Sequence, residues 1–113
     1  MGKLSVGVVG CGAIGRAILQ ATEAGILDVE IAGVASRTEK TAREFLSTLK
    51  HPAPFLSIGA LIEEADLVVE AAGSSVVPSL VDSAFEAGKG AMVISIGALI
   101  EHPELLDKAR RTN

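Results

Sequence analysis

Residues 4–15 read Leu-Ser-Val-Gly-Val-Val-Gly-Cys-Gly-Ala-Ile-Gly, and this run sets the expected architecture. Its first six residues are mostly apolar and partly β-branched, which is typical of a short strand covered on both faces. Its last six residues form a complete G-x-G-x-x-G turn. Apolar residues then recur at helical spacing, at Ile14, Ala17, Ile18 and Ala21. The run therefore predicts a strand, a glycine turn and a helix over 13–24 that stops at Gly25.

The remaining sequence repeats this alternation of strand and helix. Short apolar runs predict four further strands, over 29–35, 54–56, 66–72 and 91–96. Helical periodicity and capping residues predict four further helices, over 38–50, 58–64, 75–88 and 103–111. Strands that alternate with helices pair in parallel through right-handed crossovers. We therefore expect an α/β fold, a doubly wound, Rossmann-like parallel sheet of five strands in the order 3-2-1-4-5 with helices on both faces.

Polar residues mark the expected starts of three of these helices. Thr38, Ser57 and Ser75 are each placed to cap one. Pro78 suits the first turn of the helix after Ser75, because the N–H that proline lacks is not needed there. Gly88 is expected to end that helix.

Length and composition describe one domain, 1–113. The chain has 113 residues, of which 49% are hydrophobic and 21% are charged, enough to form a core of its own. The net charge of −4 and the absence of Trp and Tyr argue against a nucleic-acid-binding surface. No apolar stretch approaches the roughly 20 residues of a membrane-spanning helix. A single cysteine suits a reducing compartment, so we expect a cytoplasmic protein.

The glycine turn follows a strand and opens a helix, which is the context that a dinucleotide-binding turn requires. Gly10 permits the tight turn, Gly12 leaves room for a pyrophosphate, and Gly15 lets the helix pack closely on the strand. The phosphates would bind free N–H groups at the start of the helix, around Ala13 and Ile14. The alternative interpretation is a glycine-rich turn that binds nothing.

The end of the second strand indicates which dinucleotide to expect. An acidic residue about 20 positions after the glycines binds the ribose 2′-OH of NAD. Here the chain has Ser36, Arg37 and Thr38 instead. Arg37 can pair with a 2′-phosphate and stack on adenine, and the two hydroxyls add donors. The predicted cofactor is NADP or NAD, with NADP favoured; a solvated Arg37 beside the next helix is the alternative.

Two further loops lie at the carboxyl ends of strands, where such sheets bind ligands. Ala71 and Ala72 are small enough for a nicotinamide ribose to lie across them, and Ser95 and Gly97 are placed to border the nicotinamide. Glu70 is the one charge inside a strand core. It either forms a hydrogen bond at the pocket rim or binds backbone N–H groups there, and the sequence favours neither.

No catalytic or metal-binding residue is assigned from the sequence. Cys11 lies at a helix N-terminus, a setting that favours reactive thiols, but no histidine is near it and it is interpreted as turn filler. His51 and His102 each precede a proline and are interpreted as loop, surface or capping residues. Two isolated histidines without clustered carboxylates do not form a metal site.

Four segments together resemble the nucleotide-binding half of the L-aspartate dehydrogenase family. They are Gly-Cys-Gly-Ala-Ile-Gly at 10–15, Val-Ala-Ser-Arg-Thr at 34–38, Asp-Leu-Val-Val-Glu-Ala-Ala at 66–72 and Ser-Ile-Gly-Ala-Leu at 95–99. The resemblance covers essentially the whole chain. It implies NAD(P)-dependent oxidative deamination of L-aspartate to iminoaspartate, a step that feeds NAD biosynthesis. It also implies cofactor contacts at Gly10, Gly12, Ala13, Ile14, Gly15, Ser36, Arg37, Ala71, Ala72, Ser95 and Gly97.

One departure from the family's pattern concerns catalysis. Family members continue into a substrate domain that carries the catalytic histidine, whereas this sequence ends at Asn113. The resemblance therefore implies an oxidoreductase whose isolated cofactor domain is inactive, because hydride transfer needs a substrate oriented against the cofactor. L-aspartate would bind only with a second domain or chain. The unpaired edge of the fifth strand favours association, so a homo-oligomer is expected.

Three other interpretations stay open. Homoserine dehydrogenases have similar first halves, so the chain could be the cofactor domain of such an enzyme. A stand-alone module that binds or senses a dinucleotide without catalysis fits the same motifs. The third is a structural or regulatory remnant whose glycine turn is empty.

Overall fold

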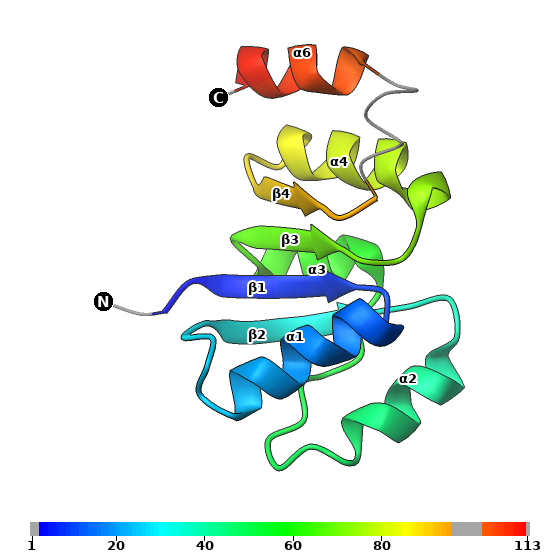
Figure 1. Cartoon of the computed structure of the whole chain (residues 1–113). Helices are drawn as coiled ribbons and strands as arrows, with labels where there is room; N and C mark the ends of the chain where they lie inside the picture. The colour runs from blue at the N-terminus through cyan, green and yellow to red at the C-terminus, as the bar shows by residue number, and fades with distance from the viewer. Residues whose placement is uncertain (1–2, 96–102, 113) are drawn as a thin grey trace.

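The computed structural model describes residues 3–95 and 103–112, which form one parallel sheet with helices on both faces (Figure 1). The sheet has the order β2-β1-β3-β4, and its strands are β1 (Ser5–Val9), β2 (Glu30–Ala35), β3 (Leu67–Glu70) and β4 (Gly90–Val93). The helices are α1 (Ala13–Glu23), α2 (Glu39–Leu46), α3 (Ile58–Glu64), the 3₁₀ turn η1 (Ser74–Val76), α4 (Val77–Glu86) and α6 (Glu104–Thr112). The α/β class and the parallel, Rossmann-like sheet are confirmed.

Two buried clusters hold the helices on the sheet. The first joins β1 to α1 and α2 through Val6, Val8, Leu19, Ala42 and Leu46. The second joins β1 and β3 to α3 and α4 through Val9, Val68, Leu61 and Leu80. Side chains of β1 thus enter cores on both sides of the sheet, which explains why its sequence is continuously apolar rather than alternating.

The predicted third strand over 54–56 is wrong as a strand, so the sheet has four strands rather than five. The segment forms only an isolated parallel bridge between Val34 and Phe55. Val34 donates its N–H to the Pro54 carbonyl at 2.9 Å, and Leu56 donates to the Val34 carbonyl at 2.8 Å. Pro54 has no N–H to extend the ladder, which limits the pairing to these bonds. The segment still lies on the outer edge of β2, the place that the expected order assigns to it.

Two helix boundaries also differ from the prediction. The helix expected over 38–50 ends at Leu46, and residues after it form tight turns in which Thr48 donates to the Phe45 carbonyl at 3.0 Å. Ser75 does not cap α4, because it lies inside η1 and the cap position belongs to Val76. The first turn of α4 does carry a proline, as expected.

The capping predictions at 38 and 57 have different outcomes. Ser57 caps α3, where its hydroxyl accepts a hydrogen bond from the Ala60 N–H at 3.2 Å. Thr38 occupies the cap position of α2, but its side chain makes no capping hydrogen bond. Gly25 and Gly88 follow α1 and α4 with positive φ angles, +82° and +74°, so both predicted stops are confirmed.

The strand predicted over 91–96 begins one residue earlier in the structure, at Gly90, and is shorter. β4 ends at Val93 and is followed by Ile94 and Ser95 in irregular backbone, while residue 96 lies outside the described part of the chain. The Ser95 N–H binds the side chain of Glu70 at 2.9 Å instead of a neighbouring strand. The hydrogen-bond ladder between β3 and β4 therefore ends before Ser95, whose N–H donates to a side chain instead.

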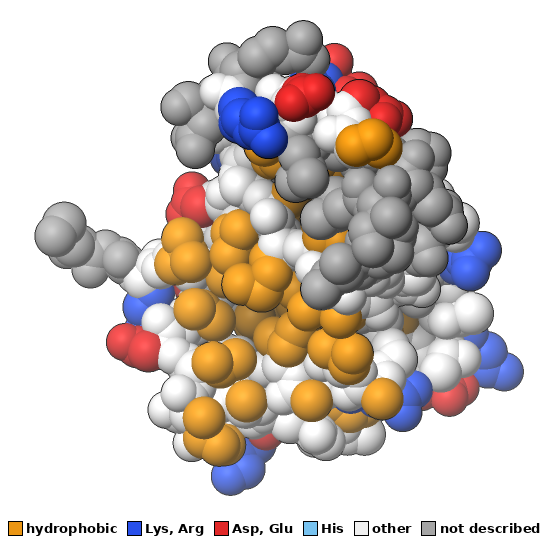
Figure 2. Space-filling model, turned by 45° about the horizontal axis from the view of Figure 1, so that its top comes forward, with side chains coloured by type: hydrophobic (Ala, Val, Ile, Leu, Met, Phe, Trp, Pro, Cys, Tyr) orange, Lys and Arg blue, Asp and Glu red, His pale blue; other side chains and the backbone are white. Residues whose placement is uncertain are grey.

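Part of the sheet face that carries α1 lies open to solvent. Met92 is 51% exposed and lies beside Val69, whose side chain belongs to the cluster under α1 and α2. Leu4, Ile14 and Ile94 are also large apolar residues with substantial exposure. Figure 2 shows hydrophobic side chains gathered over a broad area of the surface. Exposed apolar areas of this kind are typical of surfaces that contact other molecules.

Within residues 3–95 and 103–112, no helix has the length and apolar character needed to cross a membrane.

Candidate functional site

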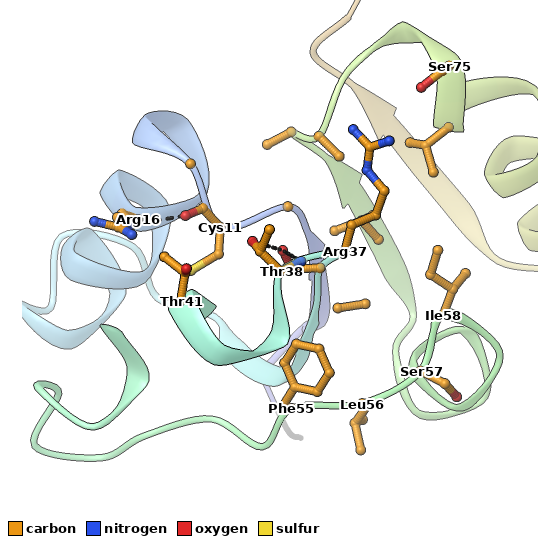
Figure 3. A pocket seen from close by; sticks show the side chains of 18 residues that line it. Cys11, Arg16, Arg37, Thr38, Thr41, Phe55, Leu56, Ser57, Ile58 and Ser75 are labelled. Carbon is orange, nitrogen blue, oxygen red and sulfur yellow. Dashed lines mark hydrogen bonds between the residues drawn. The ribbon is translucent and has the colours of Figure 1, made fainter. Parts of the chain in front are cut away.

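A cleft of about 750 Å³ opens at the carboxyl ends of β1, β2 and β3 (Figure 3). Five segments line it: 9–12, 35–38, 55–58, 71–72 and 75–76, with two further side chains from α1 and α2. The carboxyl edge of a doubly wound sheet, at the point where the crossovers change face, is the usual ligand site of such folds. The volume falls within the range of small-molecule and cofactor pockets.

Gly10 allows the chain to turn between two neighbouring strands. Its φ is +106°, a conformation that side chains disfavour, and its N–H donates to the Ala35 carbonyl at 2.7 Å. A Cβ placed on Gly10 would lie 2.6 Å from the carbonyl oxygen of Ala71. The turn after β1 is therefore held between the ends of β2 and β3, and only glycine fits there.

Gly12 and Gly15 have opposite surroundings. A Cβ on Gly15 would lie 2.1 Å from the carbonyl oxygen of Gly10, so Gly15 is required for the close packing of α1 on the turn. A Cβ on Gly12 would meet nothing within 4 Å. No fold contact therefore demands a glycine at position 12, and the space beside it is open.

The first turn of α1 offers hydrogen-bond donors to this open space. Gly12 is the N-cap residue and no side chain caps the helix. The first N–H groups of a helix have no acceptors within the helix, so those of Ala13 and Ile14 are available. Both residues are exposed. An open approach, unused N–H groups and the positive end of the helix dipole together make a site suited to a phosphate.

The end of β2 brings a cation to the cleft. Ser36, Arg37 and Thr38 all line it. The Thr38 N–H lies 3.3 Å from the Ser36 hydroxyl, and the two hydroxyl oxygens are 3.3 Å apart, so this turn is internally ordered. Figure 3 shows the Arg37 guanidinium extending in the direction of Ser75. No acidic side chain in the described part of the chain forms an ion pair with Arg37. Its charge is available to an anionic ligand.

Ala71 and Ala72 line the cleft on the β3 side, and Glu70 lies directly behind them. The Glu70 carboxylate is 1% exposed and accepts hydrogen bonds from the N–H groups of Ala72 at 2.9 Å and Gly73 at 2.7 Å. It also accepts from the N–H and the hydroxyl of Ser95, each at 2.9 Å. Of the two alternatives for Glu70, the one in which it binds backbone N–H groups is therefore observed.

These contacts determine the charge state of Glu70. Burial alone would raise the pKa of the carboxyl, but the hydrogen bonds from Gly73, Ser95 and Ala72 outweigh it and hold the pKa below its usual value. The carboxylate is therefore ionised at neutral pH and can accept all four bonds at once.

The predicted contact residues do not all face the cleft. Those that line it are Gly10, Gly12, Ser36, Arg37, Thr38, Ala71 and Ala72. Ala13, Ile14 and Gly15 form the first turn of α1 beside it. Ser95 does not line it and is instead bound to Glu70. Gly97 and His102 lie outside the described residues.

The wall formed by residues 55–58 was not predicted, because this segment reaches the cleft only through the crossover from β2 to β3. Arg16 was not predicted either; its Nε donates to the Cys11 carbonyl at 3.0 Å, and its guanidinium lies 5.0 Å from the centre of the Phe45 ring. These contacts fix the far side of the glycine turn. Cys11 belongs to the buried cluster under α1 and also lines the cleft, and its interpretation as turn filler stays a prediction.

No group of three potential metal ligands occurs in the part of the chain that the structure describes.

The sequence and structure are similar to those of known oxidoreductases. A family model described as homoserine dehydrogenase, NAD binding domain, matches residues 10–113. L-aspartate dehydrogenase 3 of Bordetella bronchiseptica is 36% identical over 108 residues, which cover 95% of this chain and 40% of that protein. L-aspartate dehydrogenase of Bradyrhizobium diazoefficiens is 38% identical over 108 residues, covering 96% and 38%. The chain thus spans about two fifths of the length of these relatives.

The fold is also found in solved structures. Myo-inositol dehydrogenase from Lactobacillus casei, solved in complex with NAD(H) and myo-inositol, superimposes with a TM-score of 0.82 at 19% identity. The match covers 96% of this chain and 34% of that one. At this identity the likeness establishes the shared fold.

Proposed function

We propose a function from one premise, namely that the chain belongs to the homoserine dehydrogenase NAD-binding domain family. The proposed function is the cofactor-binding portion of an L-aspartate dehydrogenase. Two relatives of that name are 36% and 38% identical over nearly the whole chain, which supports this choice of substrate. The proposed reaction is oxidative deamination of L-aspartate to iminoaspartate, in which the bound nicotinamide accepts a hydride.

The observation that carries cofactor binding is the uncapped start of α1 beside the open space at Gly12. We propose that the N–H groups of Gly12, Ala13 and Ile14 bind the pyrophosphate. A bound phosphate would receive hydrogen bonds and favourable interaction with the helix dipole without displacing any side chain. Gly10 and Gly15 have a supporting role, since they hold the turn and helix in this position.

The proposed adenosine end of the cofactor lies beside the 36–38 turn. Arg37 has no ionic partner in the described part of the chain, so a 2′-phosphate would supply one. The hydroxyls of Ser36 and Thr38 are placed to add hydrogen bonds. No carboxylate occupies this turn to bind a ribose 2′-OH, so we propose that NADP is preferred over NAD.

The proposed nicotinamide end lies beside Ala71 and Ala72, whose small side chains leave the cleft open on the β3 side. The residues that would orient L-aspartate and move its proton are not assigned within this chain. Hydride transfer depends on that orientation, so the domain alone is proposed to bind cofactor without turnover.

The rest of the proposed enzyme would pack on the apolar surface beside α1. The relatives are about two and a half times as long as this chain. Met92 on β4 is 51% exposed, Ile94 directly after β4 is 37% exposed, and Leu4 before β1 is 47% exposed. Covering such residues stabilises an interface by about 25 cal/mol per Å² of apolar area. We propose that a substrate domain, in the same or a second polypeptide, covers this surface.

A second candidate function is a module that binds or senses a dinucleotide without catalysis. The cleft supports this candidate, because binding a dinucleotide requires only the residues that line it. Homoserine in place of L-aspartate as substrate is a further alternative, supported by the description of the matching family.

One experiment separates these candidates. The chain is titrated with NADH and NADPH, and turnover is then assayed with L-aspartate or L-homoserine after addition of the substrate domain of an L-aspartate dehydrogenase relative. Aspartate-dependent reduction of NADP or NAD supports the proposed enzyme. Cofactor affinity without turnover in any pairing supports the binding module, and turnover with homoserine alone contradicts the aspartate assignment.

A further inference from the structure

Glu70 is the one buried charged residue among those described, and the proposed cofactor chemistry does not use it. Oε2 of its carboxylate accepts from the N–H groups of Ala72 and Gly73 and from the Ser95 hydroxyl. Oε1 accepts from the Ser95 N–H. The four donors come from only two segments, one directly after β3 and the other directly after β4. The carboxylate therefore links the ends of two neighbouring strands.

We propose that Glu70 is a positioning residue that fixes these two segments relative to each other and thereby sets the wall of the cleft beneath the nicotinamide end of the cofactor. The inference rests on the proposed function, since it names the support of that same site. Glu70 itself does not touch the cofactor, because its oxygens are already occupied and its side chain is buried.

The segment after β3 needs such support because its own side chains supply none. Residues 71–73 read Ala-Ala-Gly, and Gly73 has a φ of +134° with nothing within 4 Å of a Cβ placed on it. The Ala71 N–H is held by the Val9 carbonyl at 2.8 Å. The next two N–H groups, of Ala72 and Gly73, bind Glu70. Without the carboxylate these two donors would lose their partner at the cleft wall.

The same segment contacts the turn that approaches the proposed pyrophosphate site. A Cβ on Gly10 would lie 2.6 Å from the Ala71 carbonyl oxygen, so the segment lies close to the backbone of this turn. Glu70 therefore holds a segment whose displacement would change the shape of the cleft. Its effect is expected at the nicotinamide end, which is proposed to lie on residues 71 and 72 themselves. The glycine turn is held separately by the bond from the Gly10 N–H to the Ala35 carbonyl at 2.7 Å, and the 36–38 turn by its own bonds.

Glu70→Gln tests the proposal with nearly unchanged volume. The amide oxygen can replace Oε2 and keep the bonds from Ala72 and Gly73, but the NH₂ group then faces the Ser95 N–H, donor against donor. The reverse orientation loses the bonds from residues 72 and 73 instead. The first orientation keeps the bond from the Ser95 hydroxyl, which also goes to Oε2, so the link is weakened rather than removed. In either orientation at least one backbone N–H loses its acceptor and faces an NH₂ group, an effect that a purely space-filling role for Glu70 would not produce.

The matched control is Asp66→Asn, directly before the first residue of β3. Oδ2 of Asp66 accepts the Ser5 N–H at 3.3 Å, and Asp66 does not line the cleft. Both variants change one carboxylate on or next to β3 to an amide. Only Glu70→Gln changes the segments after the strands.

The measurement is the dissociation constant of each variant, relative to wild type, for NADPH and for ADP. ADP lacks both the nicotinamide end and the 2′-phosphate, and the 2′-phosphate is proposed to bind Arg37, away from Glu70. We expect Glu70→Gln to weaken NADPH binding about tenfold and ADP binding by less than about twofold. Asp66→Asn is expected to change neither by more than about twofold. Equal weakening of both ligands by Glu70→Gln, or unchanged binding of both, would overturn the positioning role.

A second measurement tests the link that Glu70 makes between the two strand ends, and it uses no cofactor. Failure of the Glu70 proposal is therefore distinguishable from failure of the proposed function. Amide hydrogen exchange of Ala72, Gly73 and Ser95 is followed in the wild-type chain and in both variants. Glu70→Gln is expected to speed exchange of the Ser95 amide, or of the Ala72 and Gly73 amides, by at least about tenfold relative to β1 amides. Unchanged protection at all three positions would overturn the proposal even if the chain binds NADPH.

Discussion

Gly10 and Ala71 approach each other so closely that a Cβ on Gly10 would lie 2.6 Å from the Ala71 carbonyl oxygen. This contact joins the turn after β1 to the segment after β3, and both line the cleft. The glycine turn is therefore part of the fold as well as part of the candidate site. Substitutions in it separate these two roles, because Gly12 has open space where Gly10 has none.

Gly10→Ala is expected to destabilise the domain. The added methyl meets backbone atoms of Ala71 and Ala72, and a φ of +106° is unfavourable for any residue with a side chain. We expect the free energy of unfolding to fall by about 2 kcal/mol or more. Urea denaturation followed by circular dichroism measures it. A fall below about 0.5 kcal/mol would show that the turn relaxes without cost.

Gly12→Val is expected to abolish cofactor binding while the fold survives. Its methyl groups would occupy the space in which the pyrophosphate is proposed to lie, and a Cβ there meets no atom of the protein within 4 Å. The expected result is a loss of NADPH affinity of about a hundredfold or more, with a change in stability near the ordinary helix-end range of about 1 kcal/mol. Retained affinity would mean that the phosphates bind elsewhere.

Arg37→Asp is expected to shift preference from NADP toward NAD. The substitution removes the guanidinium that would pair with a 2′-phosphate. The new carboxylate repels a 2′-phosphate and accepts a hydrogen bond from a ribose 2′-OH. The ratio of the dissociation constants for NADPH and NADH should change by about tenfold or more. Arg110→Asp is the matched control, since Arg110 pairs with Asp107 on α6 and does not line the cleft. An unchanged ratio in Arg37→Asp would show that Arg37 does not read the 2′ position.

The depressed pKa of Glu70 makes a prediction about acid stability. A carboxyl whose pKa is lower in the folded chain than in the unfolded chain stabilises the fold above the unfolded pKa, and this contribution is lost as the pH falls through the folded pKa. Wild type should therefore be more stable than Glu70→Gln at pH 7, and the difference should shrink at pH values well below the usual 4.5. Unfolding free energies of both proteins between pH 7 and pH 3 measure this. A difference that stays constant would show that the carboxylate is not the stabilising form.

Much of the fold could be predicted because its signals are local. The apolar run of β1 and the helical spacing in α1 each lie within a dozen residues, and Gly25 and Gly88 mark helix ends by their own backbone preference. The prediction of a third strand was wrong because pairing of residues 54–56 with β2 needs backbone N–H donors, and Pro54 has none.

The candidate site could be predicted only where one segment defines it. The glycine turn and the 36–38 turn follow strands directly, so sequence spacing located them. Glu70 could not be understood in this way, because its partner Ser95 lies 25 residues further along the chain. The wall at 55–58 reaches the cleft through a crossover, and no local pattern marks that approach.

The central claim is that the N–H groups at the start of α1 hold the dinucleotide. The most direct test is a titration of the ¹⁵N-labelled chain with NADPH, in which NMR monitors the amide signals of Gly12, Ala13 and Ile14. We predict saturable shifts that are largest at these amides, with smaller shifts at Arg37, and no such shifts in Gly12→Val. An absence of shifts at millimolar NADPH, or saturable shifts confined to other parts of the chain, would contradict the account.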